Sequence, residues 1–569
     1  MSLTKKQKHF INQNIQNMSI KDMSSILKCS ESDILSFLKR TEIVSKSNSK
    51  FKDKIQEVFE YKTFKEVLLE NLNFFTIIAI FLFALYQVSF NSILLSDEIT
   101  VYQTTILTKQ STILSSLFTT LFPHIVNLYA FGLNGVGYRI VTLLLHILNM
   151  ILFFYIFRNF FSEKVLKIAL VLLSAHSLIT EPLIWVSANP YVYMATLYLI
   201  SSALALKFKQ SKNLLYFFGS IIPIFILALS GGHSNFAPLF YIFFNLFILK
   251  NSFKHELVYS FWLILLIPVY GMLNKSAVDS RIASLTTGPY LEKFSQTLPF
   301  TVAKSLEIVV FPYNLALFHE ETLTPDYYLF ARLVTILFIV GFIVLFTKNK
   351  FYFGVLSLAF IYNIYIFSPV QIAWFVAERY MYFTVFIYCL LLGVLTMKIY
   401  ESYNKNLAYC FIVLAFFALT YRTFIRFDDW KTNSNLWLSN VKLSPDSHRV
   451  RNNLADSLSK ERRFAEAEEH FLYSIKINPN FAEAYMNLGN AYLQQGKLDQ
   501  AEMVYNKSLE LNPSLVDSYL NLGIIFANKR DFSRAYSNID KVIAAQPGFE
   551  QAKTIRKEIE KYENSSKKN

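Results

Sequence analysis

Long apolar runs recur along most of this chain and constrain its fold more than any other feature. A helix needs about 20 mostly apolar residues to cross a bilayer, and runs near that length are typical of membrane spans. The composition agrees, with 53% hydrophobic and only 17% charged residues. The sequence therefore predicts an all-α, polytopic membrane bundle with about eleven spans, near residues 74–95, 138–157, 165–180, 190–206, 213–230, 236–249, 256–272, 329–347, 352–368, 380–397 and 406–421.

Basic residues mark one side of these runs. Lys and Arg crowd residues 1–73 and then every second connection, whereas the connections between carry few. The positive-inside rule places the basic side in the cytoplasm. The N-terminus is then cytoplasmic, and an odd number of spans places everything after residue 422 outside. We therefore attribute the formal charge of +14 to the basic connections on the cytoplasmic side and not to nucleic-acid binding.

A second pattern begins after the last apolar run. Proline recurs every 34 residues, and asparagine and alanine recur with the same period, at Pro445, Pro479, Pro513 and Pro547, at Asn453, Asn487 and Asn521, and at Ala467, Ala501 and Ala535. This period is the tetratricopeptide pattern of paired helices. We expect a connection with a partial helix (426–445), three repeats forming an α-solenoid (446–547), and a capping helix with a polar tail (548–569).

The recurring asparagines have two interpretations. The repeats resemble those of soluble O-linked sugar transferases, where an asparagine ladder holds an acceptor backbone, which implies acceptor binding by Asn453, Asn487 and Asn521. An amide can donate and accept at once, so it suits a peptide unit of any sequence. The alternative is that these residues are ordinary consensus positions that support turns.

The N-terminal region predicts a separate small domain. Residues 17–40 resemble a helix-turn-helix module, and we place a small helical cytoplasmic domain at 1–45 and a basic linker at 46–73. DNA binding by a membrane-anchored regulator is one interpretation. An accessory domain held near anionic lipid by linker lysines is favoured, so nucleic acid is not expected as a partner.

Uncommon polar residues gather on the predicted outer side of the 74–425 membrane domain. They are Asp97, Glu98, Arg139, Glu181, His233, Glu378 and Arg379. Opposite charges at one depth suit a site that binds an anionic headgroup and removes a proton. The alternative is that these residues have no role in a site and are only solvated by water at helix ends. His146 and Asn149 lie deeper and predict hydrogen bonds between helices, while residues 110–133 suit an interfacial helix.

Several motifs together resemble the transmembrane and tetratricopeptide O-mannosyltransferases, members of the GT-C class of glycosyltransferases. They are the acidic pair in "LLSDEITV", "GYRIVTLLLHILNMILFF", "TEPLIWVSANPYVYMATL", "FPYNLALFHEETLTP", "AERYMYF" and the repeats. The resemblance covers about residues 74–560. It implies a polytopic enzyme that moves a sugar, with mannose expected, from a polyprenyl-phosphate donor to Ser or Thr of proteins on the outer face.

The resemblance also assigns roles to individual residues. It implies that Asp97, with Glu98 beside it, is the base for the acceptor hydroxyl. Arg379 is the first candidate for the donor phosphate, followed by Arg139 and His233. Glu181, Glu378 and His146 would support the site. No metal or other cofactor is expected, since a single phosphate leaves and no ligand cluster is evident in the sequence.

Two stretches depart from the family pattern. An arginine-proline pair is usual where this chain has "LFPHIV", and a lysine-glutamate pair is usual where it has "GGHSNFAP". The other hypotheses are a non-catalytic membrane scaffold whose repeats dock a cell-envelope complex, and a transporter of lipid-linked saccharide. The expected location is a bacterial inner membrane, ahead of the endoplasmic reticulum.

Overall fold

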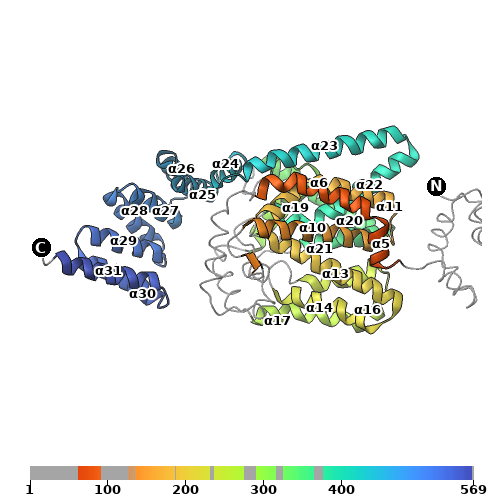
Figure 1. Cartoon of the computed structure of the whole chain (residues 1–569), viewed down its shortest axis with the longest axis horizontal. Helices are drawn as coiled ribbons and strands as arrows, with labels where there is room; N and C mark the ends of the chain where they lie inside the picture. The colour runs from red at the N-terminus through yellow and green to blue at the C-terminus, as the bar shows by residue number, and fades with distance from the viewer. Residues whose placement is uncertain are drawn as a thin grey trace, which may run out of the picture.

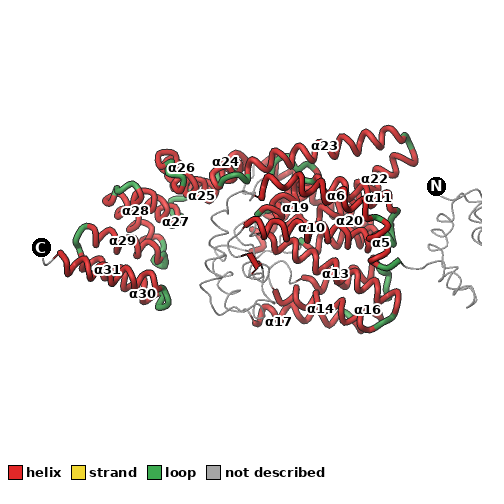
Figure 2. The backbone as a smooth tube through the Cα atoms, in the orientation of Figure 1, coloured by secondary structure: helices red, strands yellow, loops and turns green. Residues whose placement is uncertain are grey.

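The computed structural model places a helical bundle at one end of the molecule and a curved helical array at the other (Figure 1). It describes residues 62–90, 127, 130–131, 135–185, 188–230, 236–273, 290–315, 325–363 and 376–566. Helix is the prevailing structure of these residues (Figure 2). The all-α class is thus confirmed for the described part of the chain.

The bundle consists of helices up to α23. They are α5 (Phe64–Glu70), α6 (Leu72–Phe90), α10 (Gly135–Phe157), α11 (Glu163–Ala175), η2 (Ser177–Ile179), α12 (Thr180–Ile184), α13 (Asn189–Ser211), α14 (Leu214–Ser230), α15 (Ala237–Phe243), the π-helix η5 (Phe244–Ile248), α16 (Phe253–Tyr259), η6 (Phe261–Leu265), α17 (Leu266–Leu273), α19 (Tyr290–Val310), α20 (Pro325–Lys348), α21 (Lys350–Tyr362), η8 (Glu378–Met381), α22 (Tyr382–Ser402) and α23 (Lys405–Asp429). Helix α5, with a capping box at Thr63 and Glu66, lies within the stretch that the sequence predicts as a linker.

Five helices of the described chain are long and apolar enough to cross a membrane, or up to seven if two bent pairs each count as one span. Their length and apolar composition indicate a multi-pass membrane protein. Shorter apolar helices occupy other predicted runs, at Leu214–Ser230, Ala237–Ile248 and Lys350–Tyr362. A π-helical turn ends one of them, and another continues through Pro223. These lengths do not show that the helices cross, so the count of eleven stays a prediction.

Close helix packing in the bundle depends on a glycine in α22. Helices α11 and α22 pack side by side. A Cβ atom built on Gly393 would lie 2.6 Å from the backbone oxygen of Val165 in α11. Backbone cannot move aside as a flexible side chain can, and small residues are what allow helices in a membrane to approach. By contrast, a Cβ on Gly341 in α20 meets nothing within 4 Å.

Gly393→Ala is therefore expected to destabilise the protein by about 1–3 kcal/mol, the usual cost of overpacking. Gly341→Ala is the matched control, because it makes the same change inside a membrane helix without a neighbour. The control should be neutral or slightly stabilising, since alanine favours helix over glycine by about 1 kcal/mol. Thermal unfolding of the purified protein in detergent measures both, and equal midpoints would contradict the packing argument.

The array consists of three helical hairpins and two flanking helices. The elements are α24 (Asn433–Leu443), α25 (His448–Lys460), α26 (Phe464–Ile477), α27 (Ala482–Gln494), α28 (Leu498–Leu511), α29 (Val516–Asn528), α30 (Phe532–Ala545) and α31 (Glu550–Ser566). Helix α23 continues through a short turn into α24 and so joins the bundle to the array (Figure 1).

Each hairpin turns at an equivalent residue in the left-handed region. Arg462, Gly496 and Arg530 have φ values of 62°, 74° and 59°, and they are spaced by 34 residues. Inside the hairpins, Gly489 and Gly523 let the second helix approach, because a Cβ at either would lie within 2.7 Å of Tyr505 or Ile539. The 34-residue period in the sequence thus corresponds to one helical hairpin in the structure.

Candidate functional site: a buried charged cluster at the outer end of the bundle

Two buried ion pairs lie at the end of the bundle nearer the array, which we call the outer end. Arg379 Nη1 lies 2.8 Å from Glu181 Oε1, and Arg426 Nη2 lies 2.8 Å from Glu378 Oε1. Arg426 also contacts Asp429 Oδ2 through Nη1 at 2.6 Å. We call these five residues the charged cluster. Both carboxylates of the first two pairs are fully buried, so each depends on its arginine for compensation.

The short helix η8 connects the two pairs. Glu378 and Arg379 are consecutive there, yet one binds Arg426 in α23 and the other binds Glu181 in α12. The backbone N–H of Arg379 donates a further hydrogen bond to Glu181 Oε2 at 3.1 Å. One turn of chain therefore holds together a bent span and the last helix of the bundle.

Two adjacent tryptophans lie between Arg379 and Arg426 and connect the two ion pairs. The Arg379 guanidinium lies 5.1 Å from the ring centroid of Trp185, and that of Arg426 lies 5.6 Å from Trp430. The two indole rings lie 6.2 Å apart. Cations over aromatic faces are stabilised by the ring quadrupole. The stacking order therefore joins both ion pairs into one continuous unit.

The charged cluster and the two tryptophans beside it contain buried polar atoms with no hydrogen-bond partner among the described residues. They are Glu378 Oε2, Arg426 Nε and the indole nitrogens of Trp185 and Trp430. Three are donors and one is an acceptor. Buried polar atoms in proteins are nearly always paired, so this is where the described part of the bundle can best accept a polar group.

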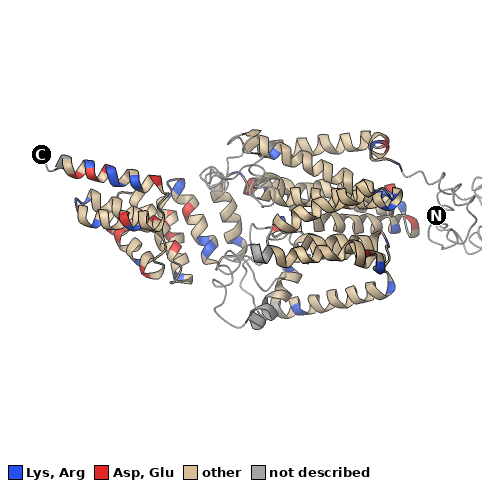
Figure 3. Cartoon of the chain, turned by 90° about the horizontal axis from the view of Figure 1, so that it is seen from below, with Lys and Arg blue, Asp and Glu red and all other residues tan. Residues whose placement is uncertain are grey.

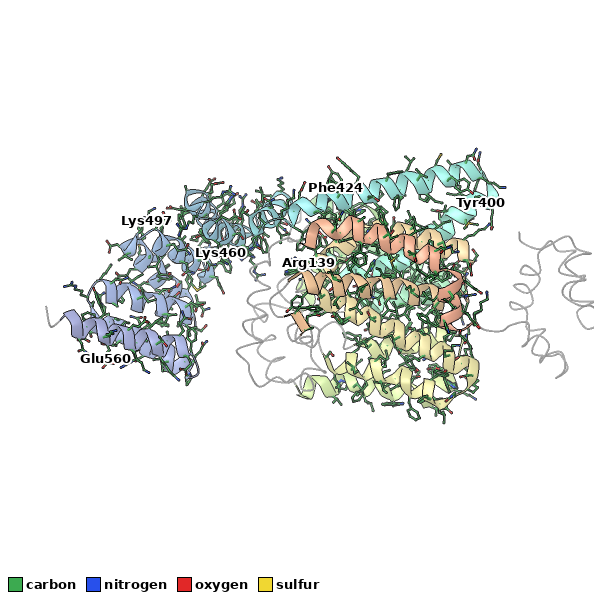
Figure 4. All side chains as sticks on the ribbon, viewed as in Figure 1. Arg139, Tyr400, Phe424, Lys460, Lys497 and Glu560 are labelled. Carbon is green, nitrogen blue, oxygen red and sulfur yellow. The ribbon has the colours of Figure 1, made fainter. Side chains whose placement is uncertain are left out.

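Arg139 and His146 make structural contacts. Arg139, at the outer end of α10 (Figure 4), donates from Nε to the backbone oxygen of Ile184 at 3.0 Å and so secures α12. His146 Nδ1 lies 2.7 Å from the Tyr382 hydroxyl, which also accepts from Asn149 Nδ2 at 3.2 Å. The hydrogen bonds between helices that the sequence predicts for His146 and Asn149 are present.

Asp97, Glu98 and His233 lie outside the described residues, as do the helix-turn-helix-like stretch 17–40 and most of the interfacial stretch 110–133. Their roles stay predictions. Of the seven outer-side residues, the structure brings Glu181, Glu378 and Arg379 together in one cluster, and Arg139 of α10 contacts the adjacent α12 through Ile184.

Sequence reasoning missed Arg426 and Asp429. It ended the last apolar run at 421 and assigned 426–445 to a connection, whereas α23 continues to Asp429. A third basic residue, Arg422, donates to the backbone oxygens of Pro312 and Tyr313. The signal in the sequence was that Arg422, Arg426 and Asp429 directly follow the apolar run 406–421, on the predicted outer side. Their spacing of four and three residues places them on one helical face.

The recurring asparagines form hydrogen bonds inside the array. Asn487 Nδ2 donates to Asn452 Oδ1 at 3.2 Å, and Asn521 Nδ2 donates to Asn490 Oδ1 at 2.9 Å. Asn453 Oδ1 accepts from Asn452 Nδ2 at 3.2 Å. The Asn487 amide nitrogen uses one of its two hydrogens in this way, whereas the Asn521 nitrogen uses both, because it also donates to the Tyr505 hydroxyl at 3.0 Å. Acceptor binding by these asparagines stays a prediction, and the amide oxygens of half-buried Asn487 and Asn521 are the acceptors that a peptide could use.

Tyr505 strengthens this inter-repeat contact. Its hydroxyl donates to Asn490 Oδ1 at 2.6 Å and accepts from Asn521 Nδ2 at 3.0 Å. Burial raises the pKa of Tyr505, and the hydrogen bond from Asn521 opposes that rise only in part. The hydroxyl therefore stays protonated and remains a donor at physiological pH.

No group of three or more His, Cys, Asp or Glu in the described ranges is placed to hold a metal ion.

Comparison with known proteins identifies the array. Residues 482–515 match the tetratricopeptide repeat family. Among solved structures, the crystal structure of MamA matches with 22% identity and a TM-score of 0.20, over 23% of this chain and 82% of that one. A comparison with curated proteins finds no match. The chain thus contains a tetratricopeptide repeat, a module that indicates protein–protein interaction, together with a multi-pass helical bundle.

Proposed function

We propose that this protein is a membrane glycosyltransferase of the GT-C type. It transfers a sugar, with mannose as the expected one, from a polyprenyl-phosphate donor to Ser or Thr of proteins on the extracytoplasmic face of a bacterial inner membrane. The observation that carries the proposal is the charged cluster. Charged side chains from α12, η8 and α23 converge at the end of the bundle where the chain enters the array.

The chemistry divides between two groups of residues. In this proposal Asp97 takes the proton of the acceptor hydroxyl as the new bond forms, and Glu98 lies beside it. Arg379, oriented by its ion pair with Glu181, stabilises the negative charge that develops on the departing lipid phosphate. The buried Glu378–Arg426 pair fixes the neighbouring turn of η8 and so acts as a positioning element.

The array supplies the acceptor in this proposal. A tetratricopeptide array presents an extended concave surface to a peptide. The match at 482–515 and the order of the hairpins support that role. The half-buried oxygens of Asn487 and Asn521 are the groups that a peptide N–H would meet.

The proposal includes eleven spans. Support comes from helices at each predicted run: besides the five long helices and two bent pairs, α14, the α15–η5 segment, the α16–α17 segment and α21 contribute apolar helix. Lysines end α13 and α20, begin α23 and follow η5, which agrees with one cytoplasmic side.

A transfer assay tests the proposal. Purified protein in lipid nanodiscs is incubated with polyprenyl-phosphate-mannose and Ser/Thr-containing peptides, and mass spectrometry detects the glycosylated peptide. We expect a mass increase of one hexose on a hydroxyl residue. If neither the mannose donor nor the corresponding glucose, galactose and N-acetylhexosamine donors yield product, the enzymatic proposal is wrong.

The tetratricopeptide match also favours a second candidate, a membrane-anchored scaffold that binds proteins without chemistry. Under the scaffold hypothesis, only the array carries the function. Deleting residues 446–566 would remove the cellular phenotype, whereas Asp97→Asn would leave it intact. The glycosyltransferase proposal expects both changes to remove it.

A further inference from the structure

Three lysines meet at the end of the bundle that lies away from the array. Lys209 lies in the last turn of α13, and Lys212 caps that helix. Lys250 lies two residues after the end of η5. Half-buried Lys209 lies within electrostatic range of both other lysines. Figure 3 shows blue Lys and Arg positions at helix ends on this side of the bundle. We call Lys209, Lys212 and Lys250 the lysine cluster.

The acidic residue nearest to the lysine cluster is engaged elsewhere. Glu256, in α16, accepts through Oε1 from Asn251 Nδ2 at 2.8 Å and through Oε2 from Ser260 Oγ at 2.5 Å. The ring nitrogen Nδ1 of His255 lies 3.1 Å from Oε1 as well. Across the described ranges, no carboxylate lies within salt-bridge distance of the three lysine nitrogens. Glu256 therefore offsets the repulsion among the lysines only through space, because within the described residues it forms no ion pair with any of the three.

The backbone gives a second, independent observation. Lys212 and Lys250 have φ values of 58° and 55°, in the left-handed region. A helix usually ends there with glycine, because an L side chain is disfavoured in that conformation. Lysine occupies this position at both helix ends, although glycine would relieve the strain. Arg462 and Arg530 adopt this conformation at hairpin turns of the array as well, so at Lys212 and Lys250 it is the position of the charge beside the other lysines that supports binding.

The surroundings of the lysine cluster are apolar and exposed. Leu214 and Leu215 follow Lys212 and are 60% and 73% exposed, and Phe253, three residues after Lys250, is 61% exposed. Exposed aliphatic and aromatic side chains beside lysines are typical of the boundary between lipid tails and headgroups. This combination of lysines and exposed apolar side chains matches a lipid, which carries an anionic headgroup next to its tails.

We propose that the lysine cluster binds the phosphate of an anionic phospholipid headgroup in the leaflet on the lysine-rich side. Three ammonium groups from two helix ends surround the phosphate, while the acyl chains lie along the exposed apolar residues of α14. The site is separate from the charged cluster at the outer end and does not depend on the proposed transferase activity.

Native mass spectrometry of the full-length protein tests this proposal with phosphatidylglycerol as the probe and phosphatidylcholine as the neutral comparison. We expect the parent to retain phosphatidylglycerol selectively. Lys209→Gln with Lys250→Gln should weaken retention by roughly 20-fold, about fivefold per lysine near an anionic surface. The matched control, Lys348→Gln with Lys350→Gln, removes the same charge at the same end of the bundle and should change retention less than about threefold.

A glycine variant separates binding from folding. Lys250→Gly removes the charge and relieves the positive φ, so its unfolding temperature in phosphatidylcholine should equal or exceed that of the parent, while retention of phosphatidylglycerol falls. The proposal is overturned if both double variants lose phosphatidylglycerol equally, which would indicate general surface attraction. It is also overturned if inorganic phosphate binds as tightly as the lipid, or if Lys250→Gly retains phosphatidylglycerol as the parent does.

Discussion

Asp97→Asn is expected to abolish transfer of sugar to peptide while the protein stays folded and membrane-inserted. A Ser or Thr hydroxyl is a weak nucleophile, and an amide cannot take its proton. The substitution keeps size and hydrogen-bonding shape, so binding of donor and peptide should survive. General-base removal typically costs at least 100-fold in rate. The measurement is the hexose-transfer assay in nanodiscs, together with peptide affinity.

Two further variants make this result specific. Glu98→Gln tests the adjacent carboxylate and should retain more activity than Asp97→Asn if Asp97 is the base. Asp456→Asn changes an aspartate of the array that bonds Lys460 at 2.7 Å, and it should leave the transfer rate unchanged. An Asp97→Asn protein that transfers sugar at the parental rate would exclude the proposed base and favour the scaffold.

The array could be predicted from sequence because its folding information is local and periodic. Each unit repeats the same small and apolar positions, so Pro, Asn and Ala at fixed 34-residue spacing locate the hairpins without knowledge of the rest of the chain. The left-handed turns at Arg462 and Arg530 were not predictable in this way. Only the middle repeat has the glycine, Gly496, that signals such a turn.

The charged cluster could be predicted only in part. The alternation of basic connections predicts that Glu181, Glu378 and Arg379 share one end of the bundle, and the structure brings them together there. Their pairing does not follow from that alternation. Glu181 and Arg379 are 198 residues apart, and no local pattern states that they meet. The expected role of Arg379 at the donor phosphate stays a prediction, and its ion pair with Glu181 is what the sequence did not indicate.

Span number shows the same limit. Hydropathy locates apolar stretches well, but it does not report how a helix is interrupted. The π-helical turn η5 ends α15 after seven residues, although the apolar sequence looks continuous, whereas α14 continues through Pro223 to Ser230. Side-chain exposure adds what hydropathy lacks: the α20 span is 11% buried and the α10 span 61%, so α20 is peripheral to the bundle and α10 is central.

Arg426→Met is expected to lower the free energy of unfolding by roughly 3–5 kcal/mol, the range for breaking a buried ion pair from one side. The arginine is fully buried and compensates Glu378, which is also fully buried. Methionine fills similar space but leaves the Glu378 carboxylate unpaired. Chemical or thermal unfolding of the purified protein, followed by tryptophan fluorescence, measures the loss, because Trp430 stacks on this arginine.

A double-mutant cycle identifies the cause. If the penalty arises from the unpaired carboxylate, Glu378→Gln added to Arg426→Met should recover part of it, since a neutral amide is far cheaper to bury than a charge. Lys431→Met is the matched control at the same helix end, because its pair with Asp428 spans 2.6 Å but both side chains are at least 60% exposed. That pair should contribute little. Additive losses in the double variant, or equal losses at Arg426 and Lys431, would show that η8 is held to α23 by packing and not by charge.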